Sequence, residues 1–484
     1  MRIDTDIPLL IYRRTKIIAT LGPRSNDDDT INRLITAGVD VFRLNMSHGT
    51  HDEHEDTYQR VRKIADKLNR PVSVLADLCG PKIRVGSFHN GRIDLVDGES
   101  VIVTTRDVEG GPGLISSRYQ ALADDVKVGN RILLDDGNME LMVTSINGPD
   151  ISCEVVTGGT LSNNKGMNLP GVAISSPSLT ESDCVDTHFA LQLGVDFLAL
   201  SFVRRFSDVE DLRTLISESR TKAAIIAKIE KPEALENIDD ILEAADGIMV
   251  ARGDLGVELP PQAVPNAQDQ LIDLARFRRK PVIVATQMLE SMINHYRPTR
   301  AEVTDVANAV RSGADAVMLS AETATGKYPV EAVEMMDGIA RQTEGYQWRQ
   351  AAFGSLTRHS QQVRPFPKED ALSESVAQLS RDLLVRAIVV ISMNDRSLGV
   401  MSSSRPAAPI VGICNDYRSS RLSNLLWGVI PITVDPAEVD NTHSLARRVV
   451  VELGLAVEGQ NILVVRGFSD DPKQNTPNLT VVTV

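Results

Sequence analysis

The sequence predicts an α/β protein built on a (β/α)8 barrel, with a small β-domain (a small β-barrel) inserted into it and an open-sheet α/β domain at the C-terminal end. Three patterns support this prediction. Short apolar runs alternate with helical patterns eight times, the alternation is interrupted between Gly80 and Val172, and a shorter second alternation follows. Strands alternating with helices form parallel sheets, and eight such units are the number that closes a barrel. Eight units in an open sheet are the alternative fold.

Three strand–helix units come before the interruption. Strands are expected at Lys16–Ala19, Val39–Asn45 and Val72–Asp77, because each run is apolar and rich in β-branched residues. Helices are expected near Asp27–Ala37 and Asp52–Leu68. This segment, residues 1–79, forms the first part of the predicted barrel.

The interruption has the composition of an all-β domain, predicted over residues 80–172. Turn sequences such as Asp97-Gly98 and Asp136-Gly137-Asn138 separate short β-rich runs. The expected strands are Val101–Thr105, Arg131–Leu134, Glu140–Ser145 and Ile151–Val156.

The strand–helix alternation resumes after Pro170-Gly171 and completes the predicted barrel with residues 173–345. Five further strands bring the number of units to eight. They are Phe197–Ser201, Ala224–Lys228, Gly247–Ala251, Pro281–Ala285 and Ala316–Leu319.

A polar stretch that contains Gly354, Pro365 and Pro367 is typical of a linker. It opens the third predicted domain, residues 346–484, whose second α/β pattern suits a separate open sheet. The strands expected there are Ala387–Ile391, Ile410–Cys414, Val429–Thr433 and Asn461–Val465.

Composition narrows the classes of function. The formal net charge of −14 argues against nucleic acid or an anionic membrane as a partner. No apolar run has the length of a membrane span, and Met1–Asp6 lacks the apolar core of a secretory signal. The four cysteines are scattered, without the spacing of a disulfide framework or a zinc site. A cytoplasmic enzyme is expected.

Polar residues at the ends of the predicted strands are the candidates for catalysis, because barrel active sites lie at the carboxyl ends of the strands. Lys228 and Glu230 are two residues apart and therefore point the same way. Arg43, Asn45 and Ser47 have the same spacing at another strand end. For Lys228 and Glu230, a buried ion pair without a catalytic role is the alternative interpretation.

The loop expected after Gly247–Ala251 carries Asp254, which could approach Glu230 across neighbouring strand ends. Two carboxylates with phosphate oxygens and water suit Mg²⁺, and Gly253 would let backbone N–H groups approach an anion. Taken alone, this loop could equally be a turn capped by the aspartate. Thr286 ends the seventh strand and could position a water or proton donor, or cap a helix.

Segments along nearly the whole chain resemble the pyruvate kinase family. The matching segments are Lys16–Pro23, Phe42–Gly49, Gly166–Gly171, Ala227–Glu230, Met249–Gly256, Ala285–Met292 and Ala321–Thr323. The inserted β-domain and the C-terminal domain also fit this family. The resemblance implies phosphoryl transfer from phosphoenolpyruvate to ADP, giving pyruvate and ATP, with Mg²⁺ (or Mn²⁺) as cofactor.

The resemblance also implies roles for single residues. Glu230 and Asp254 would hold Mg²⁺, Lys228 would stabilise the phosphoryl group, and the amides of Gly253 and Asp254 would bind the substrate carboxylate. Thr286 would lie near the enolpyruvate methylene. The remaining implied residues contact the transferring phosphate or the nucleotide, with Lys165 delivered by the β-domain as a lid: Arg43, Arg84, Pro23, Asn45, His48 and Lys165.

One segment departs from the family pattern. Where the family commonly has Asp-Thr-Lys-Gly-Pro-Glu-Ile-Arg beside a bound K⁺, this chain has Asp77-Leu-Cys-Gly-Pro-Lys-Ile-Arg84. Asn45, Ser47 and Asp77 of the cation pocket remain, and we expect the Lys82 ammonium to replace K⁺. At ~5 Å and an effective dielectric near 20 such a charge is worth roughly 3 kcal/mol, or about a hundredfold in rate. A merely solvated Lys82 is the alternative.

The resemblance further implies a homotetramer and a phosphorylated effector bound by the C-terminal domain. The candidate effector residues are Ser392, Asn394 and Ser397, with a sugar monophosphate or AMP as ligand; Asp395 in this loop disfavours a bisphosphate. The absence of any effector there is the alternative. Two other functions stay open: a metal-dependent aldol lyase, which would need no lid, and a metabolite sensor, which would be expected to lose Lys228 or a metal-binding carboxylate.

Overall fold

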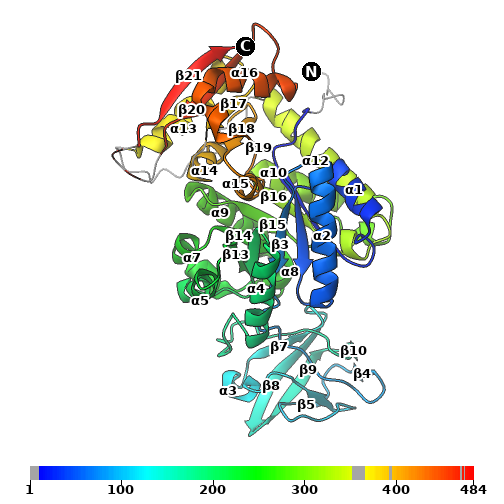
Figure 1. The fold of residues 1–484 in the computed structure, drawn as a ribbon. Coiled ribbons are helices and arrows are strands. Elements are labelled where there is room, and N and C mark those ends of the chain that lie inside the picture. The colour runs from blue at the N-terminus through cyan, green and yellow to red at the C-terminus, as the bar shows by residue number, and fades with distance from the viewer. Residues whose placement is uncertain (1–9, 351–365, 392–394, 469–470, 472, 474) are drawn as a thin grey trace.

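The computed structural model describes residues 10–350, 366–391, 395–468, 471, 473 and 475–484. These residues form three parts, with the β-domain at the bottom of Figure 1, the barrel in the middle and the C-terminal domain at the top. No helix among them combines the length and the apolar composition needed to cross a membrane.

Eight parallel strands close the barrel in the order β1-β16-β15-β14-β13-β12-β3-β2. Most are buried along their whole length, which explains why their sequences are continuous apolar runs. The barrel prediction is therefore confirmed, and the open-sheet alternative is wrong. The strands are β1 (Lys16–Thr20), β2 (Val41–Asn45), β3 (Ser73–Asp77), β12 (Phe197–Leu200), β13 (Ala224–Ile229), β14 (Gly247–Ala251), β15 (Val282–Ala285) and β16 (Ala316–Leu319).

Helices surround the barrel, and several begin at a residue whose side chain caps them. Asp27 accepts a hydrogen bond from the N–H of Thr30, and Thr50, Thr180 and Thr299 each form a capping box. The helices are α1 (Asp28–Ala37), α2 (His51–Lys67), α4 (Glu181–Leu193), α5 (Phe206–Ser217), α6 (Pro232–Glu236), α7 (Ile238–Ala244), α8 (Arg252–Glu258), α9 (Val264–Phe277), α10 (Arg300–Ser312), α11 (Ala321–Ala324) and α12 (Pro329–Arg349), with short 3-10 turns at η1 (Pro261–Ala263) and η2 (Glu290–Ile293).

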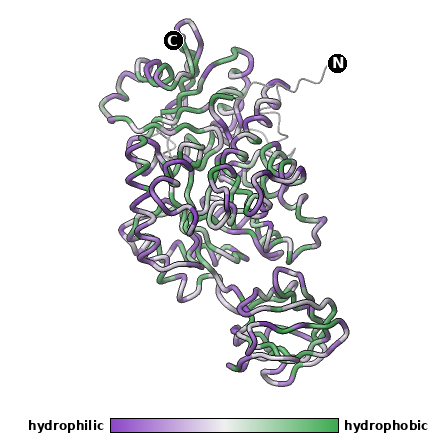
Figure 2. The backbone as a smooth tube through the Cα atoms, turned by 90° about the vertical axis from the view of Figure 1, so that its right-hand side faces the viewer, coloured by the Kyte–Doolittle hydropathy of each residue, from purple (hydrophilic) through white to green (hydrophobic). Residues whose placement is uncertain are grey.

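The β-domain consists of a six-stranded sheet, β11-β7-β8-β9-β5-β6, and a two-stranded ribbon, β10-β4. It has its own apolar core, which includes Val103, Ile115 and Leu141. Figure 2 shows it set apart from the barrel on a narrow connection. Its elements are β4 (Arg92–Leu95), β5 (Ser100–Thr104), β6 (Leu114–Ser116), α3 (Leu122–Asp125), β7 (Arg131–Leu134), β8 (Met139–Asn147), β9 (Asp150–Thr157), β10 (Gly159–Ser162) and β11 (Met167–Asn168).

The C-terminal domain is an open sheet in the order β19-β18-β17-β20-β21. No strand is predicted from the sequence at β21, an edge strand whose one buried residue is Val482. The elements are α13 (Lys368–Asp382), β17 (Ile388–Ile391), α14 (Asp395–Ser403), β18 (Ile410–Cys414), α15 (Tyr417–Ser423), β19 (Val429–Thr433), η3 (Pro436–Asn441), α16 (Thr442–Glu452), β20 (Asn461–Arg466) and β21 (Asn478–Thr483).

Four aspartates form a repeated pattern at the base of the barrel. Each aspartate stands directly before one strand, and together the four precede every second strand of the barrel. Each accepts a hydrogen bond from a backbone N–H of the preceding barrel strand and pairs with an arginine. This arrangement satisfies N–H groups at the start of the buried sheet. In each of the four groups, the residue that donates the N–H comes first, the aspartate second and the arginine third: Ile17, Asp40, Arg13; Val74, Asp196, Arg62; Ile225, Asp246, Arg213; and Val282, Asp315, Arg405.

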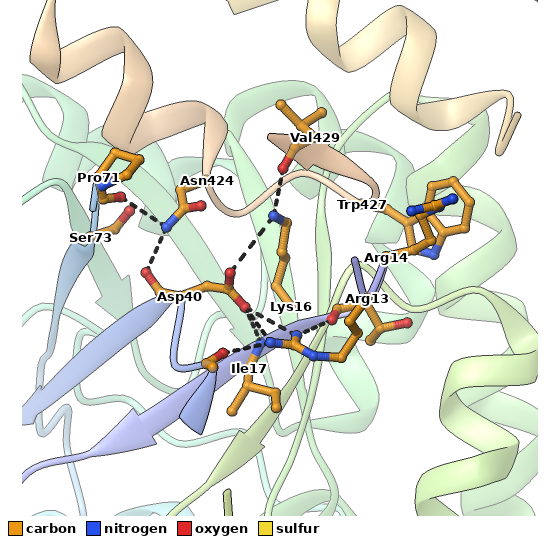
Figure 3. A network of polar contacts seen from close by, with 12 residues as sticks. Arg13, Arg14, Lys16, Ile17, Asp40, Pro71, Ser73, Asn424, Trp427 and Val429 are labelled. Carbon is orange, nitrogen blue, oxygen red and sulfur yellow. Dashed lines mark hydrogen bonds and ion pairs between the residues drawn. The ribbon is translucent and has the colours of Figure 1, made fainter. Parts of the chain in front are cut away.

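The C-terminal domain binds to three of these four aspartates. Arg405 pairs with Asp315 at 2.8 Å, and Arg421 pairs with Asp196 at 2.7 Å. At the third, Asn424 Nδ2 donates to the backbone oxygen of Asp40, as Figure 3 shows. Leu425 belongs to the apolar cluster of the barrel interior, so this domain closes the base of the barrel.

Lys16 is a buried cation between the two domains (Figure 3). Its Nζ donates to the backbone oxygen of Val429 at 2.6 Å and lies 3.8 Å from Asp40. Burial lowers the pKa of Lys16 from the ordinary 10.5 to about 8, although Asp40 opposes this change. Burial at this interface therefore disfavours the charged form of Lys16.

Candidate active site

Four ionisable side chains meet at the mouth of the barrel where β2, β3 and β13 end. Arg43 Nε lies 2.6 Å from Asp77 Oδ2. Lys228 Nζ lies 3.3 Å from Asp77 Oδ1 and 2.9 Å from Glu230 Oε1. All four side chains are largely buried, with exposed fractions of 1% for the two carboxylates. Lys228 and Glu230 lie on the same side, as their i, i+2 spacing predicts, and form a buried ion pair.

Burial and charge act in opposite directions on these groups. Burial disfavours the ammonium of Lys228, but the carboxylates of Asp77 and Glu230 outweigh it and raise its pKa above the ordinary value. Burial raises the pKa of Glu230; the charge of Lys228 opposes this effect, and that of Asp254 adds to it. Asp77 stays ionised, since Lys228 and Arg43 lower its pKa despite burial. Lys228 is therefore a permanent positive charge.

Asp254 supplies a third carboxylate beside this cluster. It lies in the first turn of α8, is half-buried, and has no hydrogen-bond or ion-pair partner within the described part of the chain. Its charge disfavours the ionised form of Glu230. Two carboxylates that repel each other fit a divalent cation, and hard oxygen ligands suit Mg²⁺. No group of three or more His, Cys, Asp or Glu side chains suited to a metal occurs in the described ranges. Mg²⁺ in proteins commonly uses one or two carboxylates together with waters and substrate phosphates.

The segment around Asp254 differs from the predicted loop. Arg252–Glu258 is a short helix, which rules out the capped turn. The N–H of Gly253 donates to Thr286 Oγ1 at 2.8 Å, and this hydroxyl donates to the backbone oxygen of Ala285 at 2.6 Å. Thr286 has a φ of 68°, which is rare for a β-branched residue, and no helix starts there. The helix-cap alternative for Thr286 is therefore wrong.

Four of the five residues proposed for the nucleotide lie outside the ionic cluster, and the fifth, Asn45, ends β2. Pro23 and His48 are exposed in the loops after β1 and β2. Arg84 and Lys165 lie together at the root of the β-domain, where Arg84 Nη1 donates to Asn164 O and Lys165 pairs with Asp135 at 2.7 Å. Neither side chain has a bond to Lys228, Glu230 or Asp254 in the described chain.

The three residues of the predicted cation pocket come from adjacent elements. Asn45 and Asp77 are register partners at the ends of β2 and β3, and the N–H of Ser47 donates to Asn45 Oδ1 at 3.3 Å. Lys82 is exposed and has no ion-pair partner among the described residues. It lines an open cleft together with Phe202, Lys231 and Asp254. The cleft lies between the barrel mouth and the root of the β-domain.

The candidate effector residues are only partly covered. Ser392 and Asn394 lie outside the described residues. Ser397 is buried within α14, with 1% of its surface exposed.

Two further buried polar groups contact or adjoin the site. Ser201 accepts a hydrogen bond from Lys228 Nζ, and Lys231 pairs with Glu258 at 2.6 Å at the far end of α8. Ser201 is a polar residue at the end of an apolar strand, which is the signal that located Lys228. Sequence alone does not reveal the pairing of Lys231 with Glu258.

Comparison with known proteins identifies the family of the barrel and of the C-terminal domain. The family model for the barrel domain of pyruvate kinase matches residues 12–333, and the model for its alpha/beta domain matches residues 370–482.

The chain belongs to the pyruvate kinase family.

Individual relatives cover most of the chain. A pyruvate kinase of Mycobacterium intracellulare is 44% identical over 94% of this chain and 95% of its own length. Pyruvate kinase 2 of Synechocystis is 44% identical over 94% of this chain and 76% of its own length. The crystal structure of a pyruvate kinase from Cryptosporidium parvum covers 98% of both chains, with a TM-score of 0.89 and 35% identity. The pyruvate kinase enzyme class is therefore shown for this chain, while the roles of single residues rest on their geometry.

Proposed function

We propose that this enzyme transfers the phosphoryl group of phosphoenolpyruvate to ADP at the cluster of Arg43, Lys228, Glu230 and Asp254. The observation that carries the assignment is the buried ammonium of Lys228 beside two carboxylates at the barrel mouth. Such a group offers a fixed positive charge to a phosphoryl oxygen without forming a covalent intermediate.

Each side chain receives one task. Lys228 and Arg43 stabilise the charge on the transferring group, since both remain protonated. Glu230 and Asp254 would hold Mg²⁺, which would supply positive charge to offset that of the phosphate oxygens. Thr286 Oγ1 is assigned to the side of the enolpyruvate methylene, where a proton is added once the phosphoryl group has left.

Substrate carboxylate and nucleotide are assigned to the surroundings of the cluster. The first turn of α8 can bind the carboxylate through the Gly253 and Asp254 amides, which requires the hydrogen bond from Gly253 to Thr286 to be shared or exchanged. Pro23, Asn45, His48, Arg84 and Lys165 are assigned to the nucleotide. Because Arg84 and Lys165 lie on the β-domain, this assignment needs the β-domain to close over the mouth.

The monovalent cation is a separate part of the proposal. We assign to the ammonium of Lys82 the charge that K⁺ supplies beside Asn45, Ser47 and Asp77, so that K⁺ is not required. The position of Lys82 on the cleft beside Asp254 supports this role. The exposure of Lys82 argues against this role, because water screens the charge of the ammonium unless the cleft closes.

Regulation, assembly and location complete the proposal. We assign a phosphorylated effector, a sugar monophosphate or AMP, to the segment with Ser392, Asn394 and Ser397, and we propose a cytoplasmic homotetramer. Titration of turnover with single phosphorylated metabolites tests the effector, and light scattering tests the tetramer.

The decisive assay is formation of ATP from phosphoenolpyruvate and ADP, with Mg²⁺, in K⁺ and in a bulky organic cation. The proposal expects ATP in both media at similar rates. ATP in K⁺ alone overturns the role of Lys82 and leaves the transfer reaction standing. No ATP in either medium, with cleavage of a 2-keto acid, would establish the aldol lyase instead.

A further inference from the structure

The two residues that follow β12, Ser201 and Phe202, form a corner between the ionic cluster and the β-domain. On one side they contact Lys228 and Glu230. On the other they contact both chain segments that connect the barrel to the β-domain. The outgoing connection starts at Leu78, directly after β3, and the returning connection ends at α4.

Ser201 joins the catalytic ammonium to the outgoing connection through one hydroxyl. Its Oγ accepts a hydrogen bond from Lys228 Nζ at 2.7 Å and donates to the backbone oxygen of Leu78 at 2.7 Å. With 1% of the residue exposed, water cannot replace either partner. The position of the ammonium is therefore tied to the first residue of the outgoing connection.

Phe202 makes the same link for the metal-site carboxylate and the returning connection. Its N–H donates to Glu230 Oε2 at 2.8 Å, and its backbone oxygen accepts a hydrogen bond from Ser178 Oγ at 2.8 Å. The φ of Phe202 is 54°, an outlier for a bulky aromatic residue. Such outliers persist where surrounding contacts enforce them, and they concentrate at functional sites.

Gly80, in the outgoing connection, packs closely against this corner. It has a φ of 66°, and a Cβ added to it would lie 2.9 Å from Ser201 Cβ and 2.9 Å from Phe202 Cδ2. The backbone of Gly80 therefore packs against Ser201 and Phe202 with no room for a side chain, and packed groups cannot interpenetrate. A movement of the β-domain that displaces Gly80 toward this corner would therefore shift Ser201 or Phe202.

The ammonium of Lys228 gives this coupling a chemical consequence. It has three donors, and here it faces three acceptors, on Ser201, Asp77 and Glu230. Asp77 Oδ1 is in ion-pair contact with the ammonium but has no hydrogen-bond partner among the described residues, whereas Ser201 Oγ is hydrogen-bonded to it. Ser201 is the neutral acceptor and the one bonded to Leu78, so movement of the outgoing connection moves the hydrogen bond that orients the ammonium.

We propose that the Ser201–Phe202 corner couples closure of the β-domain to the positions of Lys228 and Glu230, with Ser201 as a positioning residue for the ammonium. The proposal rests on the role that the proposed function gives to Lys228. It makes the phosphoryl site complete only when the β-domain covers the substrate, which keeps water from the transferring group.

The first test is Ser201→Ala, which removes both hydrogen bonds at little change in volume. We expect kcat to fall at least about tenfold, as for other misplaced catalytic groups, while KM for ADP stays unchanged. Hydrogen–deuterium exchange reports the coupling itself: phosphoenolpyruvate with Mg²⁺ should protect amides of residues 78–84 and 172–178 in the wild type, and this protection should be largely lost in Ser201→Ala.

The matched control is Ser402→Ala in the C-terminal domain. Ser402 is equally buried, accepts a hydrogen bond from Arg405 Nη1 at 3.2 Å and donates to the backbone oxygen of Trp427 at 2.9 Å. Ser402→Ala therefore removes the same kinds of hydrogen bond as Ser201→Ala, but at a place away from the barrel mouth. Its kcat and its exchange protection should match those of the wild type.

A second variant keeps the proposal testable should Ser201→Ala fail to fold. Ser178→Ala removes the hydrogen bond to Phe202 O without changing any contact of Lys228. It should reduce protection of the amides of residues 78–84 and 172–178, with a smaller loss of kcat than Ser201→Ala. Wild-type protection in either folded variant overturns the coupling, even if turnover falls. A wild-type enzyme that forms no ATP refutes the proposed function instead, and the exchange comparison still decides the coupling.

Discussion

The backbone N–H of Gly253 donates a hydrogen bond to Thr286 Oγ1 at 2.8 Å, which joins the first turn of α8 to the end of β15. The same hydroxyl donates to the backbone oxygen of Ala285. Arg252 adds a contact from its Nη2 to the backbone oxygen of Thr286 at 2.7 Å. Thr286 therefore determines where α8 begins, and with it the position of Asp254.

Replacing Thr286 by valine tests this relationship. Thr286→Val keeps the shape of the side chain but leaves the Gly253 N–H without its acceptor, which should displace the first turn of α8. We expect kcat/KM for phosphoenolpyruvate to fall about a hundredfold, the range found when a single fixed hydrogen-bonding group is removed from an active site. Thr286→Ser, which keeps the hydroxyl, should remain within about tenfold of the wild type. Equal losses in both variants would contradict a role for the hydroxyl.

The dependence on K⁺ can be changed at one residue. Lys82→Glu should make turnover depend on K⁺, with about a hundredfold difference between K⁺ and a bulky organic cation. Lys82→Met should be slow in both media. If the turnover of Lys82→Glu did not depend on K⁺, this would show that Lys82 is only a solvated side chain.

The buried pair of Arg405 and Asp315 should contribute strongly to stability. Its two side chains are 2% and 3% exposed, so Arg405→Met leaves an unpaired buried carboxylate and should lower the free energy of unfolding by about 3–5 kcal/mol. Arg213→Met is the matched control, because Arg213 and Asp246 form the equivalent pair at 37% and 38% exposure. It should cost at most about 1 kcal/mol. Similar losses of stability in urea unfolding would contradict the interpretation.

Lys16 should make stability depend on pH. Because its folded pKa of about 8 lies below the ordinary 10.5, the folded chain releases this proton first. Below pH ~8 the buried ammonium destabilises the fold, and this penalty is relieved as pH rises to ~10.5. Relative to Lys16→Met, the wild type should gain up to about 3 kcal/mol across this window, at ~1.4 kcal/mol per pKa unit. A constant difference between the two unfolding curves would contradict the assignment.

Sequence patterns located the parts of the fold that depend on local burial. β14 and β15 were predictable because strands buried on both faces are continuous apolar runs. Lys228 and Glu230 were predictable because their two-residue spacing places both at one strand end. The edge strand β21 was not, since only one of its residues, Val482, is buried, so that burial imposes no periodic pattern on this strand.

The missing parts of the site depend on contacts between distant segments. Thr286 and Phe202 have positive φ values that no local residue pattern requires. The hydrogen bonds from Ser201 to Leu78 and from Ser178 to Phe202 span 123 and 24 positions of the chain. Such contacts follow from closure of the barrel, so a single sequence does not show them.

The most direct test of the central claim is the turnover of Lys228→Met. The account predicts that this variant binds Mn²⁺, measured by electron paramagnetic resonance, with an affinity near that of the wild type, because Glu230 and Asp254 remain. It predicts that formation of ATP from phosphoenolpyruvate and ADP falls by a factor of about a thousand or more, as for loss of a charge that stabilises phosphoryl transfer. Turnover near the wild-type rate would contradict the assignment of the barrel-mouth cluster as the phosphoryl-transfer site.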